Sequence, residues 1–129
     1  MRIDHLAIWT HHLESLRNFY ENYFDVKAVE KYSNPAKQIE LYELTFPYGG
    51  RLDLMQNPTI PDNRNDVQTQ STGLIHFAVG VGSEDTANAL VTRLRADGIR
   101  IVGEPRRTGK GYYECFLLDP DGNRVEITI

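Results

Sequence analysis

The sequence predicts an α+β fold made of two repeated β-α-β-β-β units, and three observations support that prediction. Two parts of the chain match each other in turn residues, strand pattern and charge. Within each part, an alternating segment is followed by a segment of helical periodicity and then by further alternating segments. The composition, with 40% hydrophobic and 25% charged residues, is that of a globular protein.

The repeat is clearest where each part ends. PYGGRLDLM (47–55) aligns with PDGNRVEIT (120–128), so that Pro, Gly and Arg coincide. Asp53 then falls on Glu126, 73 positions later (126 − 53). Chance rarely keeps one register through turn, strand and charge type together, so we interpret the match as a duplication.

The two parts also begin alike. IDHLAI (3–8) aligns with LIHFAV (74–79), which places His5 on His76 at an offset of 71 (76 − 5). The change of two residues in offset is one that a surface loop tolerates. We therefore expect a first unit over residues 1–56, a linker over 57–72 and a second unit over 73–129 within a single domain.

The first unit should open with a strand, because residues 2–9 alternate and put Leu6 and Ile8 on one side. A helix is predicted over 13–24 and should begin near Thr10 or His11. Its apolar stripe consists of Leu13, Leu16, Tyr20 and Tyr23. Further strands are predicted over 27–32, 38–46 and 51–55.

The second unit repeats this order. Its helix should have Ser83 as N-cap and should end at Gly98. The apolar stripe of that helix consists of Ala87, Leu90, Val91 and Leu94. Strands are predicted over 99–103, 112–118 and 123–128.

The overall charge excludes some classes of partner. A formal net charge of −4 gives no electrostatic basis for binding nucleic acid or an anionic membrane. No apolar run approaches the roughly 18 residues of a membrane span. Cys115 is the only cysteine, which excludes an internal disulfide and fits a reducing, cytoplasmic environment.

Each unit has a histidine on its first predicted strand and a carboxylate on its last: His5 with Asp53, and His76 with Glu126. Alternation places these side chains on the face opposite the apolar residues that cover the helices. Two imidazoles and two carboxylates suit a divalent nickel, zinc, cobalt or iron ion and leave positions for water or substrate. The alternative is that they are the wet side of ordinary half-exposed strands.

The segments IDHLAI, LRNFYENYF, LIHFAV and LLDPDGNRVEI make the whole chain resemble the vicinal oxygen chelate superfamily. This superfamily includes glyoxalase I, extradiol dioxygenases, fosfomycin-resistance thiol transferases and bleomycin-resistance proteins. The resemblance implies two β-α-β-β-β modules that form an incomplete barrel around a metal-binding cup. It also implies a homodimer, with the site formed within one chain or across two.

The pattern resembles that of glyoxalase I, in which histidine and glutamate alternate as four ligands. Here the second ligand position is Asp53, one methylene shorter, and the resemblance leaves open whether this carboxylate binds the metal directly or through water. Extradiol dioxygenases use two histidines and one glutamate around ferrous iron. His5, His76 and Glu126 satisfy that pattern as well.

The resemblance to glyoxalase I implies a lyase or isomerase acting on a small-molecule substrate, the hemithioacetal of a 2-oxoaldehyde and a small thiol. The metal acts as a Lewis acid and stabilises an enediolate while a carboxylate moves the proton. Glu126 is the first choice for that base and Asp53 the second, because the longer side chain has the greater reach. Cys115 is given no role.

Five cationic residues are candidates for substrate binding: Arg106, Arg107 and Lys110 in a glycine-containing loop over 103–113, and Arg51 and Arg124 beside the carboxylates. Trp9, Tyr113 and Met55 are candidates for an apolar pocket wall. Each of these residues has an equally ordinary structural explanation, as a solvated charge or a packed side chain. His11 and His12 are expected to be exposed and without chemistry.

Two further functions stay open. One is another metal enzyme on the same scaffold, either a ferrous dioxygenase or an antibiotic-modifying thiol transferase. The other is a metal-free protein that sequesters a hydrophobic ligand, as bleomycin-resistance proteins do; the presence of all four candidate ligands counts against it.

Overall fold

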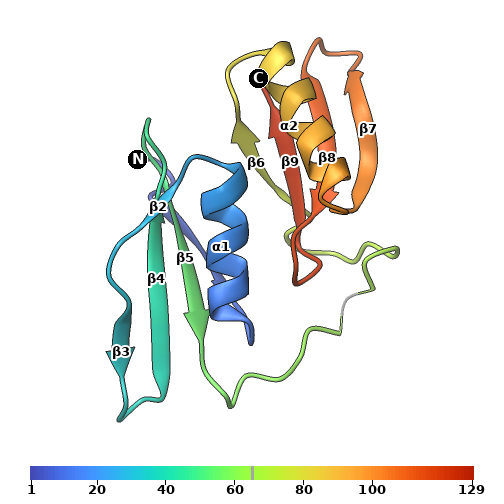
Figure 1. Cartoon of the computed structure of the whole chain (residues 1–129). Coiled ribbons are helices and arrows are strands. Elements are labelled where there is room, and N and C mark those ends of the chain that lie inside the picture. The colour runs from blue at the N-terminus through green and yellow to red at the C-terminus, as the bar shows by residue number, and fades with distance from the viewer. Residues whose placement is uncertain (65) are drawn as a thin grey trace. The chain divides into compact units, whose positions relative to one another are not determined.

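The computed structural model describes residues 1–64 and 66–129, which divide into two compact units, Met1–Asn63 and Arg64–Ile129. Asn65, in the expected linker, lies outside the described residues. In each unit a helix covers one face of that unit's own sheet (Figure 1). The prediction of an α+β fold with two repeated units is confirmed.

The first unit has a five-stranded sheet in the order β1-β5-β4-β2, with β3 also paired to β4. The first and last strands, β1 and β5, are parallel neighbours, whereas the remaining pairs are antiparallel. Its elements are β1 (His5–Trp9), α1 (Leu13–Tyr23), β2 (Lys27–Ala28), β3 (Tyr32–Asn34), β4 (Ile39–Thr45) and β5 (Arg51–Gln56).

The second unit has a four-stranded sheet in the equivalent order β6-β9-β8-β7. Again the first and last strands, β6 and β9, are parallel neighbours. Its elements are β6 (Phe77–Gly80), α2 (Glu84–Ala96), β7 (Ile101–Arg107), β8 (Tyr113–Leu118) and β9 (Arg124–Thr128).

The core of each unit lies between its helix and the helix-facing side of its sheet. On the last strands, Leu52, Leu54, Val125 and Ile127 are almost fully buried, as the alternation predicts. The buried residues of the helices are Leu13, Leu16, Phe19 and Tyr20 in α1, and Ala87, Val91 and Leu94 in α2. Phe19 was missing from the predicted stripe, whereas Tyr23 and Leu90 are only half-buried.

Local interactions explain where α1 begins and where α2 begins and ends. Ser83 is the N-cap of α2 and accepts a hydrogen bond from the Thr86 backbone N–H (3.1 Å), as predicted. Gly98 follows that helix with φ of +77°, a conformation that glycine adopts without strain. At α1, His12 occupies the N-cap position and Thr10 supports it, because the Thr10 hydroxyl accepts from the His12 N–H (2.8 Å).

Three predicted strands differ from those of the structure by more than one residue at an end. The strand expected over 2–9 spans only His5–Trp9. The strand expected over 27–32 is divided into β2 and β3, because its pairing with β4 slips by one residue between Ala28↔Leu44 and Tyr32↔Leu41. The strand expected over 99–103 spans Ile101–Arg107, because its second half also pairs with β8.

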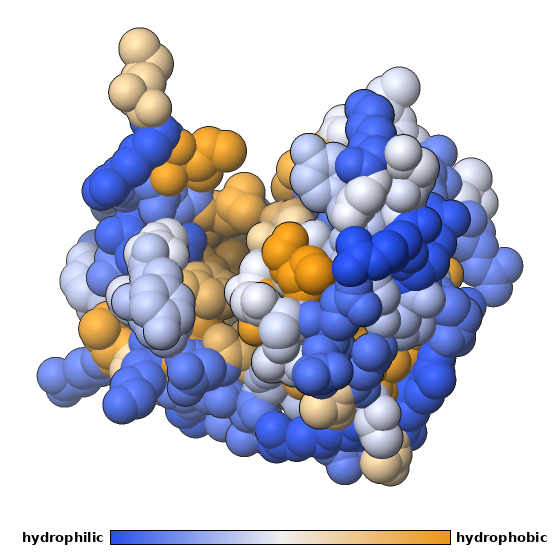
Figure 2. Space-filling view, turned by 90° about the horizontal axis from the view of Figure 1, so that it is seen from above, coloured by the Kyte–Doolittle hydropathy of each residue, from blue (hydrophilic) through white to orange (hydrophobic). Residues whose placement is uncertain are grey.

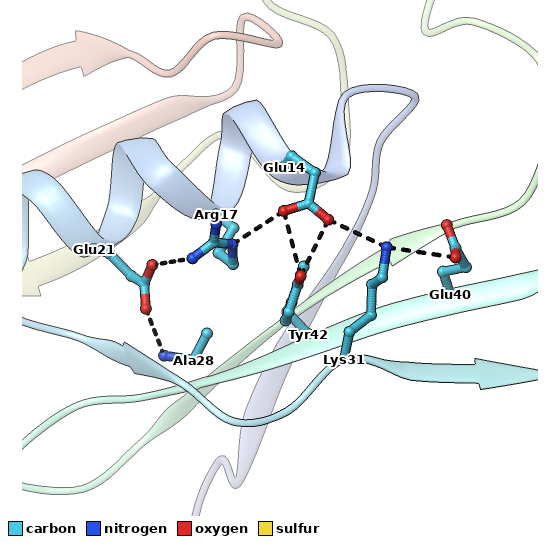
Figure 3. A network of polar contacts seen from close by, with 7 residues as sticks. All are labelled: Glu14, Arg17, Glu21, Ala28, Lys31, Glu40 and Tyr42. Atoms are coloured by element: carbon cyan, nitrogen blue, oxygen red, sulfur yellow. Dashed lines mark hydrogen bonds and ion pairs between the residues drawn. The ribbon is translucent and has the colours of Figure 1, made fainter.

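A polar network joins α1 to β4 and to the segment before β3 (Figure 3). The Tyr42 hydroxyl and the Lys31 ammonium donate to the same oxygen of Glu14, at 3.1 and 3.2 Å. The Arg17 guanidinium lies 5.1 Å from the centroid of the Tyr42 ring and donates to Glu21 (2.5 Å). Burial opposes ionisation of Glu14, but the hydrogen bonds from Lys31 and Tyr42 outweigh it and lower the pKa of that carboxyl.

The surface in Figure 2 is mainly hydrophilic, with apolar side chains exposed in smaller patches. Among the exposed apolar residues are Trp9, Tyr48, Leu74 and Tyr112. Within the described part of the chain, no helix is both long enough and apolar enough to span a bilayer.

Candidate functional site

The first histidine and carboxylate meet because β1 and β5 are parallel neighbours. The register pairs His5 with Arg51 and Ala7 with Asp53, so His5 and Asp53 are diagonal neighbours on one face. His5 Nε2 lies 3.8 Å from Asp53 Oδ2. The Asp53 side chain is 12% exposed and that of His5 42%, so the acid lies deeper than the imidazole.

The second unit brings together the equivalent residues. His76 Nε2 lies 2.8 Å from Glu126 Oε2, and Glu126 faces Ala78 in the β6–β9 register. His76 directly precedes β6, which corrects the expectation that it lies on the first strand of its unit. In the β6–β9 register the first paired residue is Phe77, which faces Val125, so the pairing stops one residue after His76.

A tight turn sets the register of Glu126. The Asp119 carboxylate accepts hydrogen bonds from the backbone N–H groups of Asp121 (3.0 Å) and Asn123 (2.8 Å). Gly122 completes the turn with φ of +82°. Because side chains alternate along a strand, moving this turn by one residue would place Glu126 on the helix side.

Phe116 orients the imidazole of His76. It lies opposite Glu126 on β8, and its ring meets that of His76 edge to face with centroids 5.2 Å apart. Gly103 on β7 makes room for this ring, since a Cβ there would lie 2.9 Å from Phe116 Cδ2. His76 Nδ1 is buried and, among the described residues, has no hydrogen-bond partner, so the interactions of this imidazole centre on Nε2.

Arg51 and Arg124 occupy equivalent positions but make different contacts. Arg51 donates from Nε to Asp53 Oδ1 (2.7 Å) and from Nη2 to Oδ2 (3.2 Å). Arg124 donates instead to the backbone carbonyl of Val67 (3.3 Å). In the sequence both arginines stand two residues before a carboxylate, on the same strand face. This spacing permits the two-bond contact of Arg51 with Asp53, called the fork below, but does not require it.

The donor atoms of the second pair fit a transition metal. Two donors bound side by side to one ion at about 2.1 Å lie about 3 Å apart, close to the separation of His76 and Glu126. The wider separation of His5 and Asp53 accompanies the fork from Arg51. Within neither unit do three or more His, Cys, Asp or Glu side chains of the described residues gather closely enough to hold a metal. Each unit therefore supplies a pair.

The segment 103–113 is not the loop that the sequence predicts. Arg106 and Arg107 belong to β7. Arg106 donates to Glu114 (2.8 Å), and Arg107 donates to Glu84 and to the Gly111 carbonyl (3.1 Å). Lys110 lies in the turn between β7 and β8 that the Thr108 N–H closes by donating to the Tyr112 carbonyl (2.8 Å). The arginines therefore already have acidic partners.

The residues expected to line an apolar wall fall on different sides of the sheets. Trp9 and Met55 are register partners on the face that carries His5 and Asp53. Tyr113 points the other way: it is buried, and its hydroxyl donates to Asn88 of α2 (2.6 Å). The expectation for Tyr113 is thus wrong, because alternation along β8 places it with the core residues Cys115 and Leu117.

Cys115 and His11, which were expected to have no chemical role, have ordinary structural environments. Burial raises the pKa of the Cys115 thiol to about 11, so the reactive thiolate is scarce near neutral pH. His11 Nε2 lies 3.6 Å from the carboxylate of Asp62, which is almost fully exposed.

Several solved structures share this fold. A glyoxylase/bleomycin resistance protein/dioxygenase domain from Frankia sp. EAN1pec is 16% identical, with a TM-score of 0.84 over 100% of this chain and 97% of that one. The trypanothione-dependent glyoxalase I of Leishmania major is 24% identical, with a TM-score of 0.78 over 99% and 86%. A glyoxalase I variant from Zea mays is 23% identical, with a TM-score of 0.80 over 98% of this chain and 44% of that one.

A search of curated protein sequences found no match. Identity below 25% to the solved structures establishes a common fold and no common activity. Residues 2–127, nearly the whole chain, match the family described as Glyoxalase/Bleomycin resistance protein/Dioxygenase superfamily. The chain belongs to this superfamily.

Proposed function

We propose that this chain is a metal-dependent lyase of the glyoxalase I type, which isomerises the hemithioacetal of a 2-oxoaldehyde and a small thiol. The observation that carries the proposal is the pairing of a histidine with a carboxylate at equivalent places in both units, at 3.8 and 2.8 Å. Two unrelated surface ion pairs have no reason to recur at the same register of a duplicated fold. Membership of a superfamily that includes glyoxalases supports the same reading.

His5, His76 and Glu126 are the proposed metal ligands, with Asp53 as the fourth. Neutral imidazoles and carboxylates are the donors that nickel, zinc, cobalt and ferrous ions share. A bound divalent ion supplies Lewis acidity, which stabilises negative charge that develops on substrate oxygens. The small exposed fractions of Asp53 (12%) and Glu126 (13%) limit competition from water at these carboxylates.

Glu126 is the proposed general base. It removes the proton from the carbon that carries the thiol and returns it to the neighbouring former carbonyl carbon, so that the substrate is isomerised without a net change in atoms. Two features favour Glu126 over Asp53. Its side chain is longer, and both oxygens of Asp53 accept hydrogen bonds from Arg51.

The proposed substrate carries a small thiol co-substrate with anionic groups, which Arg106 and Lys110 would attract. Arg106 lies on the same face of the sheet as Glu126. Arg106 is the register partner of Glu114, and Glu114 is the register partner of Thr128, which stands two residues after Glu126 and so points to the same side. Its side chain is 69% exposed, so it can meet a ligand while it stays paired with Glu114. We also propose that the chain works as a homodimer.

A second function has one specific observation in its favour. The fork from Arg51 removes Asp53 from the donor set and leaves His5, His76 and Glu126. Two histidines and one carboxylate form the ligand set of non-haem ferrous oxygenases. A ferrous ring-cleaving dioxygenase is therefore the alternative.

The experiment is metal analysis of protein purified without added metal, followed by assays of methylglyoxal–thiol isomerisation with nickel, zinc and ferrous ions. We expect about one ion per chain and metal-dependent turnover, which His76→Ala and Glu126→Gln should each lower at least about 100-fold. His11→Ala is the matched control, because it removes another histidine that faces a carboxylate.

Each other result has a defined meaning. Bound metal without isomerase activity refutes the lyase proposal, and cleavage of catechols with ferrous ion would then establish the alternative. Protein that binds none of these ions refutes both and leaves a ligand-sequestering protein. An equal loss of turnover in His11→Ala would show that histidine removal acts through stability, which a urea titration of each variant measures.

A further inference from the structure

The guanidinium of Arg51 holds the Asp53 carboxylate at both oxygens. The Nε and Nη2 distances of 2.7 and 3.2 Å describe a bidentate, charge-assisted pair, the strongest common form of this interaction. The pair lies largely out of water, with the Asp53 side chain 12% and the Arg51 side chain 33% exposed. A guanidinium is cationic at any ordinary pH, so the two hydrogen bonds join opposite charges.

The second unit lacks this restraint. Arg124 occupies the equivalent position but donates to the Val67 carbonyl, while Glu126 lies 2.8 Å from His76 Nε2. The two carboxylates are equivalent in the repeat, and the arginine contact distinguishes their hydrogen bonding. One carboxylate is held by a cation of the protein itself, and the other faces its imidazole directly.

We propose that Arg51 is a positioning residue that competes with the metal ion for Asp53. This inference rests on the proposed function, because it requires a divalent ion near Asp53. The fork engages both Asp53 oxygens, so a divalent ion that binds either oxygen meets the positive charge of the guanidinium, and Asp53 becomes a full ligand more readily when the fork opens. Arg51 therefore weakens metal binding and keeps the site a three-ligand site until it turns away.

A destination for the released guanidinium is already in place. Arg51 Nη1 lies 3.7 Å from Glu43 Oε1, and Glu43 is the register partner of Asp53 on β4. Rotation toward Glu43 keeps a carboxylate beside the arginine charge, which lowers the cost of leaving Asp53. Glu43 is thus the acceptor that makes an exchange between metal and arginine feasible.

The first test is the zinc and nickel affinity of the metal-free protein, measured by calorimetry. Arg51→Gln removes the charge and the fork, and we expect it to bind zinc on the order of tenfold more tightly than the unmodified chain. Arg51→Lys keeps the charge without the fork and should fall between the two. The matched control is Arg124→Gln, which we expect to change the affinity by less than about twofold, because Arg124 contacts no carboxylate oxygen of the pair.

The gain must depend on Asp53. In an Asp53→Asn background, Arg51→Gln should no longer tighten zinc binding, since there is no carboxylate to release. Unchanged or weaker zinc binding by Arg51→Gln overturns the inference, as does an equal gain in the Asp53→Asn background. If neither the unmodified chain nor any variant binds a divalent ion, the proposed function fails together with the inference. If the unmodified chain binds zinc and Arg51→Gln matches it, only the inference fails.

A second measurement follows the arginine itself and needs no variant that has to fold. The Nε–H of Arg51 should give a slowly exchanging nitrogen-15 NMR signal in the metal-free chain, because it donates to a poorly exposed carboxylate. Titration with zinc, which is diamagnetic, should shift that signal and speed its exchange. A signal that remains unchanged at saturating zinc refutes the displacement of Arg51.

Discussion

Replacing Gly103 by alanine tests how tightly the second unit holds Phe116. An ideal Cβ at this position lies 2.9 Å from Phe116 Cδ2 and 3.2 Å from Phe116 Cβ, both closer than carbon atoms normally approach. The contact reaches the base of the ring as well as its edge, so a small rotation does not relieve it. The backbone of Gly103 is not left-handed, and the strain comes from crowding alone.

The magnitude follows from two opposing terms. Overpacking a filled site costs about 1–3 kcal/mol. Replacing glycine by alanine restricts the unfolded chain and returns about 0.4–1 kcal/mol. We therefore expect Gly103→Ala to lower the free energy of unfolding by about 1 kcal/mol, measured by urea denaturation. Because Phe116 packs on His76, the His76 ring resonances should shift in the proton NMR spectrum.

Two further variants separate crowding from other effects. Gly80→Ala is the control, because Gly80 also lies on a strand without left-handed backbone and has no atom within 4 Å of the ideal Cβ. It should be neutral or slightly stabilising. Phe116→Leu should relieve the clash, so that Gly103→Ala costs little in that background. The same cost in both backgrounds, or no cost at all, would refute the assignment of Phe116 as the crowded neighbour.

The other two predictions concern the polar network and the cysteine. Tyr42→Phe removes the hydroxyl bond to Glu14 and should lower the free energy of unfolding by about 0.5–1 kcal/mol at pH 7, a modest value because Glu14 is half exposed. Since the folded pKa of Glu14 lies below its ordinary value, this contribution is present above pH 4.5 and should shrink as the pH falls through the lowered pKa; an equal difference at pH 3 in urea titrations would contradict it. Because burial raises the pKa of Cys115 to about 11, its thiol should react with Ellman's reagent at pH 8 only as urea unfolds the chain, and rapid reaction of the folded protein would exclude this.

Hydrophobic periodicity predicted the architecture, because the pattern reflects which residues are buried and every residue of a strand or helix contributes to it. The alternation around Asp53 and Glu126 therefore identified the buried faces of β5 and β9 correctly. The limits of strands were less predictable, since they depend on the partner strand. β7 continues to Arg107 because β8 is there to pair with it, and no pattern within 103–107 signals this.

The contacts of charged side chains were the least predictable part. Arg51 and Arg124 have the same sequence context, two residues before a carboxylate, yet one donates to that carboxylate and the other to the carbonyl of Val67. The difference arises from a backbone oxygen far away in sequence, so only coordinates reveal it. Tyr113 is a different case, because the alternation along β8 already places it with Cys115 and Leu117 on the core side, where its hydroxyl contacts Asn88 of α2.

The parallel pairing of first and last strands has a consequence for folding. His5 and Asp53, and likewise His76 and Glu126, come from opposite ends of their units, so each pair closes a loop that contains a whole helix and the intervening strands. Such contacts have high contact order and form late, after the entropy of closing the loop has been overcome. In zinc fingers, closely spaced ligands let the ion organise the chain. Here the ion would arrive at an assembled scaffold, so chelators should strip it without unfolding the protein.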